Sequence, residues 1–156
     1  MNNESMKNED EMKYALPIAI LSTLGKIEGK TKMQKIVGII QFKGVASKYS
    51  SKIYNYELYH HGPFSSDLAE ILDELISAGM IQLAVSTSPK GNYAYTYSLT
   101  KLGKEYSKVF EARKVLSESI KNTISEICNQ TRNLSLPDLV RLAYAEFDCS
   151  KKEECT

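Results

Sequence analysis

The feature that most constrains the fold is a pair of alternating segments separated by a turn sequence. Apolar residues alternate with polar or small residues over 81–86 and again over 93–99, and the residues between include Pro89 and Gly91. A period of two is typical of a strand with one buried face, and Pro with Gly favours a chain reversal. We therefore predict a two-stranded hairpin. The tyrosines on one face of its second strand are Tyr93, Tyr95 and Tyr97. They either cover the helical core or form an exposed binding surface.

Capped helices are predicted on both sides of the hairpin. Ser65 or Ser66 can accept a hydrogen bond from the first turn of a helix that Gly79 ends. The buried stripe of that helix is Leu68, Ile71, Leu72, Leu75 and Ile76. Thr100 can cap the helix that follows the hairpin, and its apolar period continues to Ile127, with or without a break.

Two more helices are predicted near the start of the chain. Apolar residues recur at spacings of three and four from Tyr14 onward, and Pro17 suits the first turn of such a helix. The pattern returns over 31–44, where Thr31 is the expected N-cap and Gly44 the expected end.

A short strand and a last helix complete the pattern. Residues 54–60 alternate as in a strand, and Gly62 and Pro63 are expected to terminate it. Ser135 is expected to begin the last helix, which ends in a charged tail.

This order of elements predicts an α+β, mainly helical fold: a winged helix-turn-helix domain with a two-stranded wing and additional C-terminal helices. The polar residues 1–12 have little to bury and are expected to form a flexible lead-in. The winged-helix core is expected over 13–100, a C-terminal helical extension for packing or dimerisation over 101–150, and a tail over 151–156.

Composition limits the class of protein. The chain has 156 residues, of which 42% are hydrophobic and 25% charged, as in a single globular domain. No apolar run is long enough for a membrane span, and the N-terminal residues lack the apolar core of a signal peptide. The 3 cysteines predict no disulfide framework. We therefore expect a cytoplasmic protein with no membrane partner.

Three segments resemble a known family. The runs KTKMQKIVGIIQF, YELYHHGPFSSDLAEILDELISAGMI and YSLTKLGKEY are similar to the YwgA-like and Panacea-type (antitoxin-like) winged-helix proteins of bacteria and archaea. The resemblance covers about residues 30–147, and His61 replaces the tyrosine that precedes Gly62 in the family pattern. It implies a winged-helix fold, and for Panacea-type members it implies binding to partner proteins rather than catalysis.

Catalytic, cofactor and metal sites are not predicted. The two histidines, His60 and His61, are adjacent, and no nucleophile motif or phosphate-binding glycine loop occurs. The spacing of Cys128, Cys149 and Cys155 matches no standard zinc pattern. We expect a protein that is not an enzyme and that needs no cofactor.

Local charge favours nucleic-acid binding by lysines. Residues 26–48 contain six lysines and a single glutamate, and Lys90 lies in the expected turn of the wing. The predicted phosphate contacts are Lys30, Lys32, Lys35, Lys43 and Lys90. The alternative interpretation is a solvated helix face.

The helix before the hairpin has the opposite charge. It contains no Lys or Arg, and its Asp and Glu side chains would be repelled by a phosphate-lined groove. A protein interface is the alternative that we predict for Asp67, Glu70 and Glu74, and a homodimer seam is predicted for Leu116, Ile120 and Ile124.

Together these patterns predict a homodimeric regulator that binds duplex DNA through lysines, with a protein-interaction module of antitoxin or adaptor type as the alternative. A continuous basic surface joining Lys30, Lys32, Lys35 and Lys90 would favour DNA. An apolar groove flanked by the acidic residues would favour a protein partner.

Overall fold

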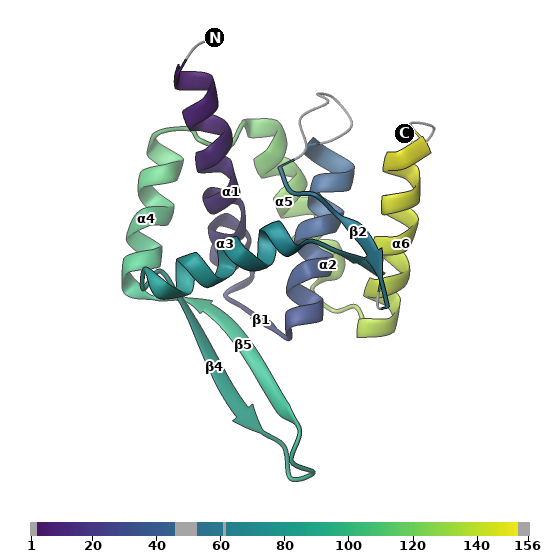
Figure 1. Cartoon of the computed structure of the whole chain (residues 1–156). Helices are drawn as coiled ribbons and strands as arrows, with labels where there is room; N and C mark the ends of the chain where they lie inside the picture. Colours follow the sequence, from purple (N-terminus) through teal and green to yellow (C-terminus); the bar gives the residue numbers. More distant parts are fainter. Residues whose placement is uncertain (1–2, 46–52, 61, 153–156) are drawn as a thin grey trace.

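The computed structural model describes residues 3–45, 53–60 and 62–152, which form six α-helices and two small antiparallel sheets (Figure 1). The elements are α1 (Asn3–Leu24), β1 (Lys26–Glu28), α2 (Lys30–Ile40), the π-helical turn η1 (Gln41–Val45), β2 (Glu57–Tyr59), β3 (Gly62–Phe64), α3 (Ser66–Ser77), β4 (Ile81–Thr87), β5 (Tyr93–Leu99), α4 (Lys101–Ala112), α5 (Glu118–Thr131) and α6 (Leu136–Lys152). The predicted α+β, mainly helical class is confirmed.

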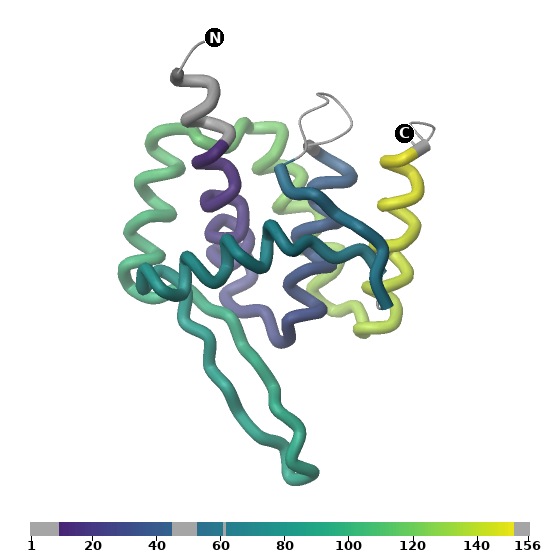
Figure 2. Tube along the Cα trace, in the orientation of Figure 1, coloured from purple at the N-terminus to yellow at the C-terminus, as the bar shows by residue number. Residues whose placement is uncertain are grey.

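Helix α2 lies among the other helices and packs against α5 and α6, while α1 packs against α3, α4 and α5. Helix α3 crosses in front of this layer, and β4 with β5 projects away from it as a long hairpin (Figures 1 and 2). One buried apolar cluster runs from Ala15 in α1 to Phe147 in α6. The expected division at residue 100 therefore separates helices that share a single core.

The two-stranded hairpin predicted from the alternating residues is confirmed. Strands β4 and β5 are antiparallel, with Leu83 opposite Tyr97 and Val85 opposite Tyr95. A third strand, β1, pairs with β5 and places Ile27 opposite Tyr97, so the sheet order is β1-β5-β4. The sequence analysis did not predict β1, since three residues with one buried side chain carry almost no periodic signal.

Helix α1 is longer than expected at its N-terminal end. It begins at Asn3, so residues 3–12 of the predicted lead-in form part of the helix, and Pro17 lies inside it rather than in its first turn. A proline at this position has no N–H to donate to the carbonyl of Lys13. The buried hydroxyl of Tyr54 donates to that carbonyl instead, so a long-range contact replaces the missing helical hydrogen bond.

Helix α2 is buried on all sides. It begins after Gly29, which makes no side-chain cap, so Thr31 is not the N-cap, and the chain continues through Gly44 as a π-helical turn. Every residue from Met33 to Ile40 is buried. Buried polar side chains on such a helix need hydrogen-bond partners, and the following segment supplies them.

Two glutamines supply the main link between α2 and the segment after it. The Gln34 amide donates to the Ser65 carbonyl and accepts from the Ser65 N–H, both at 2.9 Å. The Gln41 amide makes the same pair of bonds to Tyr54, both at 2.8 Å. We call these four hydrogen bonds the amide clamps. They fix the backbone at both ends of the stretch that contains the short hairpin of β2 and β3.

The short hairpin differs from the predicted single strand. Gly62 and Pro63 do not terminate a strand but form β3, where Gly62 pairs with Tyr59. Gly62 has φ +98°, and a Cβ atom there would lie 3.1 Å from the Tyr144 ring and 3.4 Å from Lys35 Cε. Only glycine fits this turn and this close approach.

The caps predicted for the helices after residue 64 are confirmed. Ser65 accepts from the Leu68 N–H at 3.2 Å, Thr100 from the Gly103 N–H at 3.0 Å, and Ser135 from the Asp138 N–H at 3.3 Å. Gly79 follows α3 with φ +78°. These signals are local, which is why the sequence alone locates them.

The predicted dimer seam is wrong. The long helical pattern breaks between α4 and α5 at Lys114, which has φ 54°. After the break, Leu116, Ile120 and Ile124 are 6%, 8% and 3% exposed and belong to the core of the single chain. A second copy cannot reach these side chains.

The amide clamps give a first prediction. In Gln34→Leu, the buried Ser65 N–H and carbonyl lose both partners, so we expect the free energy of unfolding to fall by about 3 kcal/mol. Urea unfolding followed by circular dichroism measures this. The control Gln82→Leu changes an exposed strand residue and should cost less than about 0.5 kcal/mol. Equal effects of the two variants would contradict the role of the clamp.

Candidate functional sites

The long hairpin changes from buried to exposed along its length. At its base Ile81 and Tyr97 are 2% and 5% exposed, whereas Val85 and Tyr93 nearer the tip are 54% and 68% exposed. All four lie on the same face of the hairpin, by the pairing register. Tyr97 therefore covers the core, as the first alternative for the tyrosines predicts, whereas Tyr93 is an exposed surface residue.

Cationic side chains lie along the hairpin and around its base. The Lys30 ammonium lies 4.4 Å from the centre of the Tyr95 ring, and Lys90 is exposed in the turn between β4 and β5. Lys32 is half-buried on α2, and the guanidinium of Arg132, just after α5, lies 3.5 Å from the Thr23 carbonyl near β1. We call these four residues the hairpin cationic surface. Arg132 was not singled out from the sequence, because only the fold brings it to the C-terminal end of α1.

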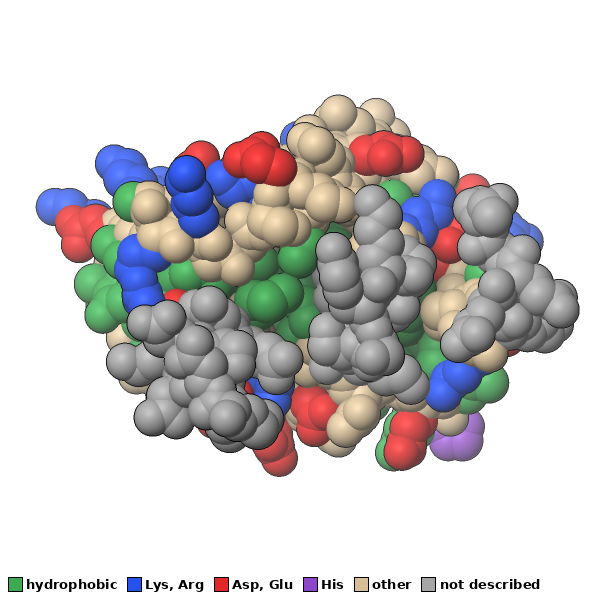
Figure 3. All heavy atoms as spheres, turned by 90° about the horizontal axis from the view of Figure 1, so that it is seen from above, with side chains coloured by type: hydrophobic (Ala, Val, Ile, Leu, Met, Phe, Trp, Pro, Cys, Tyr) green, Lys and Arg blue, Asp and Glu red, His purple; other side chains and the backbone are tan. Residues whose placement is uncertain are grey.

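Neighbouring carboxylates change the net charge of this surface only slightly. Lys26 in β1 forms an ion pair with Glu28 at 3.2 Å, and both side chains are largely exposed, so the pair adds no net charge. The end of the molecule opposite the hairpin tip differs: there Lys or Arg and Asp or Glu side chains are interspersed around the rim (Figure 3).

The structure contradicts one of the five predicted phosphate contacts and places a second beside a carboxylate. Lys35 is only 2% exposed, and its ammonium donates to the Pro63 carbonyl at 2.8 Å. Lys43 forms an ion pair with Glu146 on α6 at 3.6 Å. A continuous basic surface through Lys35, which would have favoured DNA, is therefore absent, because the short hairpin covers that side of α2. Lys30, Lys32 and Lys90 keep accessible side chains.

The acidic face of helix α3 points away from the core, as expected, while most of its apolar residues are buried. Glu70 and Asp73 are exposed, while Asp67 accepts a hydrogen bond from the Asn55 N–H at 3.0 Å and Glu74 accepts one from the Tyr14 hydroxyl. Two of its carboxylates thus hold neighbouring segments in place. Neither of the two cavities described next lies beside this helix.

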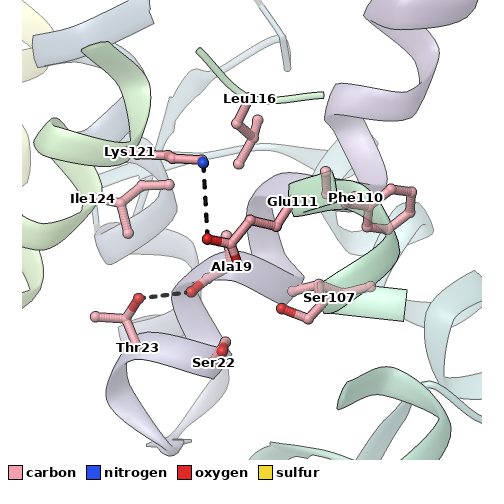
Figure 4. Close-up of a pocket in the computed structure, with 11 residues that line it drawn as sticks. Ala19, Ser22, Thr23, Ser107, Phe110, Glu111, Leu116, Lys121 and Ile124 are labelled. Carbon is pink, nitrogen blue, oxygen red and sulfur yellow. Dashed lines mark hydrogen bonds and ion pairs between the residues drawn. The ribbon is translucent and has the colours of Figure 1, made fainter. Parts of the chain in front are cut away.

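The first cavity lies between α1, α4 and α5 and has a volume of about 220 Å³ (Figure 4). Apolar side chains such as Leu116 and Ile124 line it, and Lys121 reaches Glu111 across it, with 3.9 Å between the Lys121 Nζ and a Glu111 carboxylate oxygen. Because Lys121 also pairs with Glu118 at 3.5 Å, its charge is already compensated.

The second cavity lies between the start of α2 and the short hairpin and has a volume of about 340 Å³. Lys30, Lys35, Tyr59, His60 and Phe64 are among the residues that line it. The structure therefore brings Lys30 and Lys35 together at a cavity rather than on an open face. Sequence analysis could not predict this cavity, since the α2 and β2–β3 residues are about thirty positions apart.

The cysteines and histidines form no site in the described part of the chain. Burial raises the pKa of the free Cys128 thiol to about 11, which keeps it protonated and unreactive. Cys149 is disulfide-bonded, which the odd number of cysteines did not predict. His60 is exposed, and His61 lies outside the described residues. No three His, Cys, Asp or Glu side chains there are grouped as a metal site would need.

Comparison with protein-family models, curated proteins and solved structures finds no match for this chain. None of the helices in the described ranges has the length and apolar character needed to cross a bilayer.

Tyr97 at the base of the long hairpin gives a second prediction. Burial, with a smaller effect of Asp73, raises the pKa of Tyr97 from 10.0 to about 12. Because the unfolded chain releases this proton more easily, the stabilisation is complete below pH 10 and is lost as the pH rises toward 12. Tyr97→Phe should therefore lose less stability than the wild type across this range in urea unfolding. A Tyr93→Phe control, changed at an exposed ring, should follow the wild type, and identical profiles for all three proteins would contradict the prediction.

Proposed function

We propose that this chain is a winged-helix protein that binds duplex nucleic acid through its long hairpin and the hairpin cationic surface. The order α1, β1, α2, α3, β4 and β5, with β1 paired to the second hairpin strand, supports this fold. It is the order of helix, strand, two helices and wing that defines a winged helix. The short hairpin is an insertion between the two helices, and α4 to α6 are additions.

The observation that carries the proposal is the position of two lysines, Lys30 of α2 and Lys90 of the turn, along a projecting hairpin. The hairpin extends from the body of the molecule (Figure 1), with Lys30 held against the Tyr95 ring part-way along it and Lys90 at its tip. The opposite hairpin face carries only small or polar uncharged residues, such as Gln82, Ser86 and Thr96. A duplex backbone can therefore approach both ends of the hairpin without meeting a carboxylate on either strand.

The expected mode of binding is independent of sequence. The exposed side chains of α3 include Glu70 and Asp73 and no cation, so this helix is unsuited to a phosphate-lined groove. Lysine contacts to phosphates give affinity that falls steeply with salt and carry little base preference.

A fluorescence titration of labelled duplex DNA tests the proposal. With three or four phosphate contacts, the wild-type affinity should fall by roughly fortyfold to a hundred and fiftyfold when salt rises from about 50 to about 200 mM. The triple variant Lys30→Glu, Lys32→Glu and Lys90→Glu should lose binding and most of the salt dependence. The matched control Lys104→Glu, Lys108→Glu and Lys151→Glu changes the net charge equally at exposed positions of α4 and α6.

The control decides between local contact and bulk charge. Loss of binding in the hairpin variant alone, with unchanged circular dichroism, would support the proposed surface. Equal loss in both variants would show that only net charge matters, and absence of wild-type binding at low salt would refute the duplex-binding function.

Exposed apolar side chains favour a second candidate function, protein interaction through α4. Leu102, Tyr106 and Val109 are 40%, 39% and 46% exposed and follow one another along this helix. The helix also carries both Lys108 and Glu105, so two antiparallel copies can pair opposite charges, which makes a second copy the partner to test first.

Light scattering after size-exclusion chromatography tests this self-association. We expect the wild type to have the mass of a dimer and Val109→Glu to have that of a monomer, because a carboxylate would be buried in the interface. The control Val85→Glu introduces the same charge on the exposed hairpin and should leave the mass unchanged. A monomeric wild type at all concentrations would refute the α4 interface.

A further inference from the structure

The cavity between α2 and the short hairpin has the size and charge of an anion site. Its volume of about 340 Å³ lies within the range of small-molecule sites, roughly 300–1,000 Å³. Lys30 and Lys35 line it from α2 and His60 lines it from the short hairpin, and the described residues of its wall include no Asp or Glu. These three side chains therefore have no carboxylate beside them among the described residues of the wall.

Lys35 is the group that most needs a partner. Its side chain is 2% exposed, and its ammonium, which has three N–H donors, makes one hydrogen bond, to the Pro63 carbonyl. None of the ion pairs among the described residues involves Lys35. Burial disfavours the charged form and lowers the pKa of Lys35. A buried cation is costly unless an anion compensates it, and the cavity beside it has room for one.

The walls of the cavity limit the kind of anion. The rings of Tyr59 and Phe64 lie 5.4 Å apart, edge to face, and present apolar surface. One buried ammonium matches a single negative charge. Inorganic phosphate would bury some of its oxygens against the carbon atoms of these rings, whereas a carboxylate attached to an apolar group satisfies both the cationic and the aromatic part of the wall.

We propose that this cavity binds a small organic monocarboxylate, with the carboxylate on the Lys35 ammonium and the apolar group against Tyr59 and Phe64. This proposal does not rest on the proposed duplex-binding function, since no contact of the ligand requires nucleic acid.

Isothermal titration of the full chain with benzoate tests the proposal, with benzyl alcohol and inorganic phosphate as comparison ligands. Wild-type protein should bind benzoate saturably and should bind the other two at least about tenfold more weakly, since a hydrogen bond to a charged group is worth roughly tenfold or more in affinity. In Lys35→Met, which keeps the length of the side chain without its charge, benzoate affinity should fall by the same factor. The control Lys32→Met changes a lysine of the same helix that does not line the cavity and should leave benzoate binding unchanged.

Three results would overturn the proposal: no saturable benzoate binding, equal binding by Lys35→Met and the wild type, or phosphate binding as tight as benzoate. If Lys35→Met does not fold, Tyr59→Ala decides, because Tyr59 is 55% exposed and its removal leaves the core intact. Benzoate affinity must then fall in Tyr59→Ala while the wild type still discriminates against benzyl alcohol.

Discussion

The arrangement of this chain depends on the amide clamps that Gln34 and Gln41 make from the buried helix α2. They bind the backbone of Tyr54 and Ser65, and the side chains of these two residues make hydrogen bonds to other helices. Tyr54 supplies the donor that Pro17 removes from α1, and Ser65 caps α3. The clamps thus connect α1, α2 and α3 through backbone groups rather than through apolar contact alone. Apolar burial can tolerate small shifts of one helix past another, but paired hydrogen bonds at 2.8–2.9 Å fix one register.

The parts of the fold that the sequence predicted are those with local signals. Ser65, Thr100 and Gly79 act within one helical turn, and the alternation of the long hairpin reflects its own two strands. Lys35 could not be placed in this way. It lies opposite the apolar stripe of α2, which on a surface helix means solvent, but Pro63 and α6 cover that side. Whether a lysine is exposed depends on which other segments pack over it. The exposure of the candidate phosphate contacts was therefore the least predictable feature.

The same reason explains the wrong dimer seam. A stripe such as Leu116, Ile120 and Ile124 shows that a helix buries one face, but not whether the cover comes from its own chain or from a copy. Here the strained turn at Lys114 reverses the chain, so that α5 packs against α1 and α2. Within the same periodic pattern, the exposed apolar side chains Leu102, Tyr106 and Val109 are on α4, before the break.

The two proposed anion sites share one side chain. Lys30 lines the cavity and also lies against Tyr95 of the long hairpin, so its charge contributes to both places. A carboxylate in the cavity would offset part of the field that a duplex phosphate meets at the base of the hairpin. Linkage requires the reverse as well: a phosphate held by Lys30 must weaken carboxylate binding by the same factor. Because Lys35 is buried and Lys90 lies at the tip, this antagonism acts through Lys30 and leaves the rest of each site unchanged.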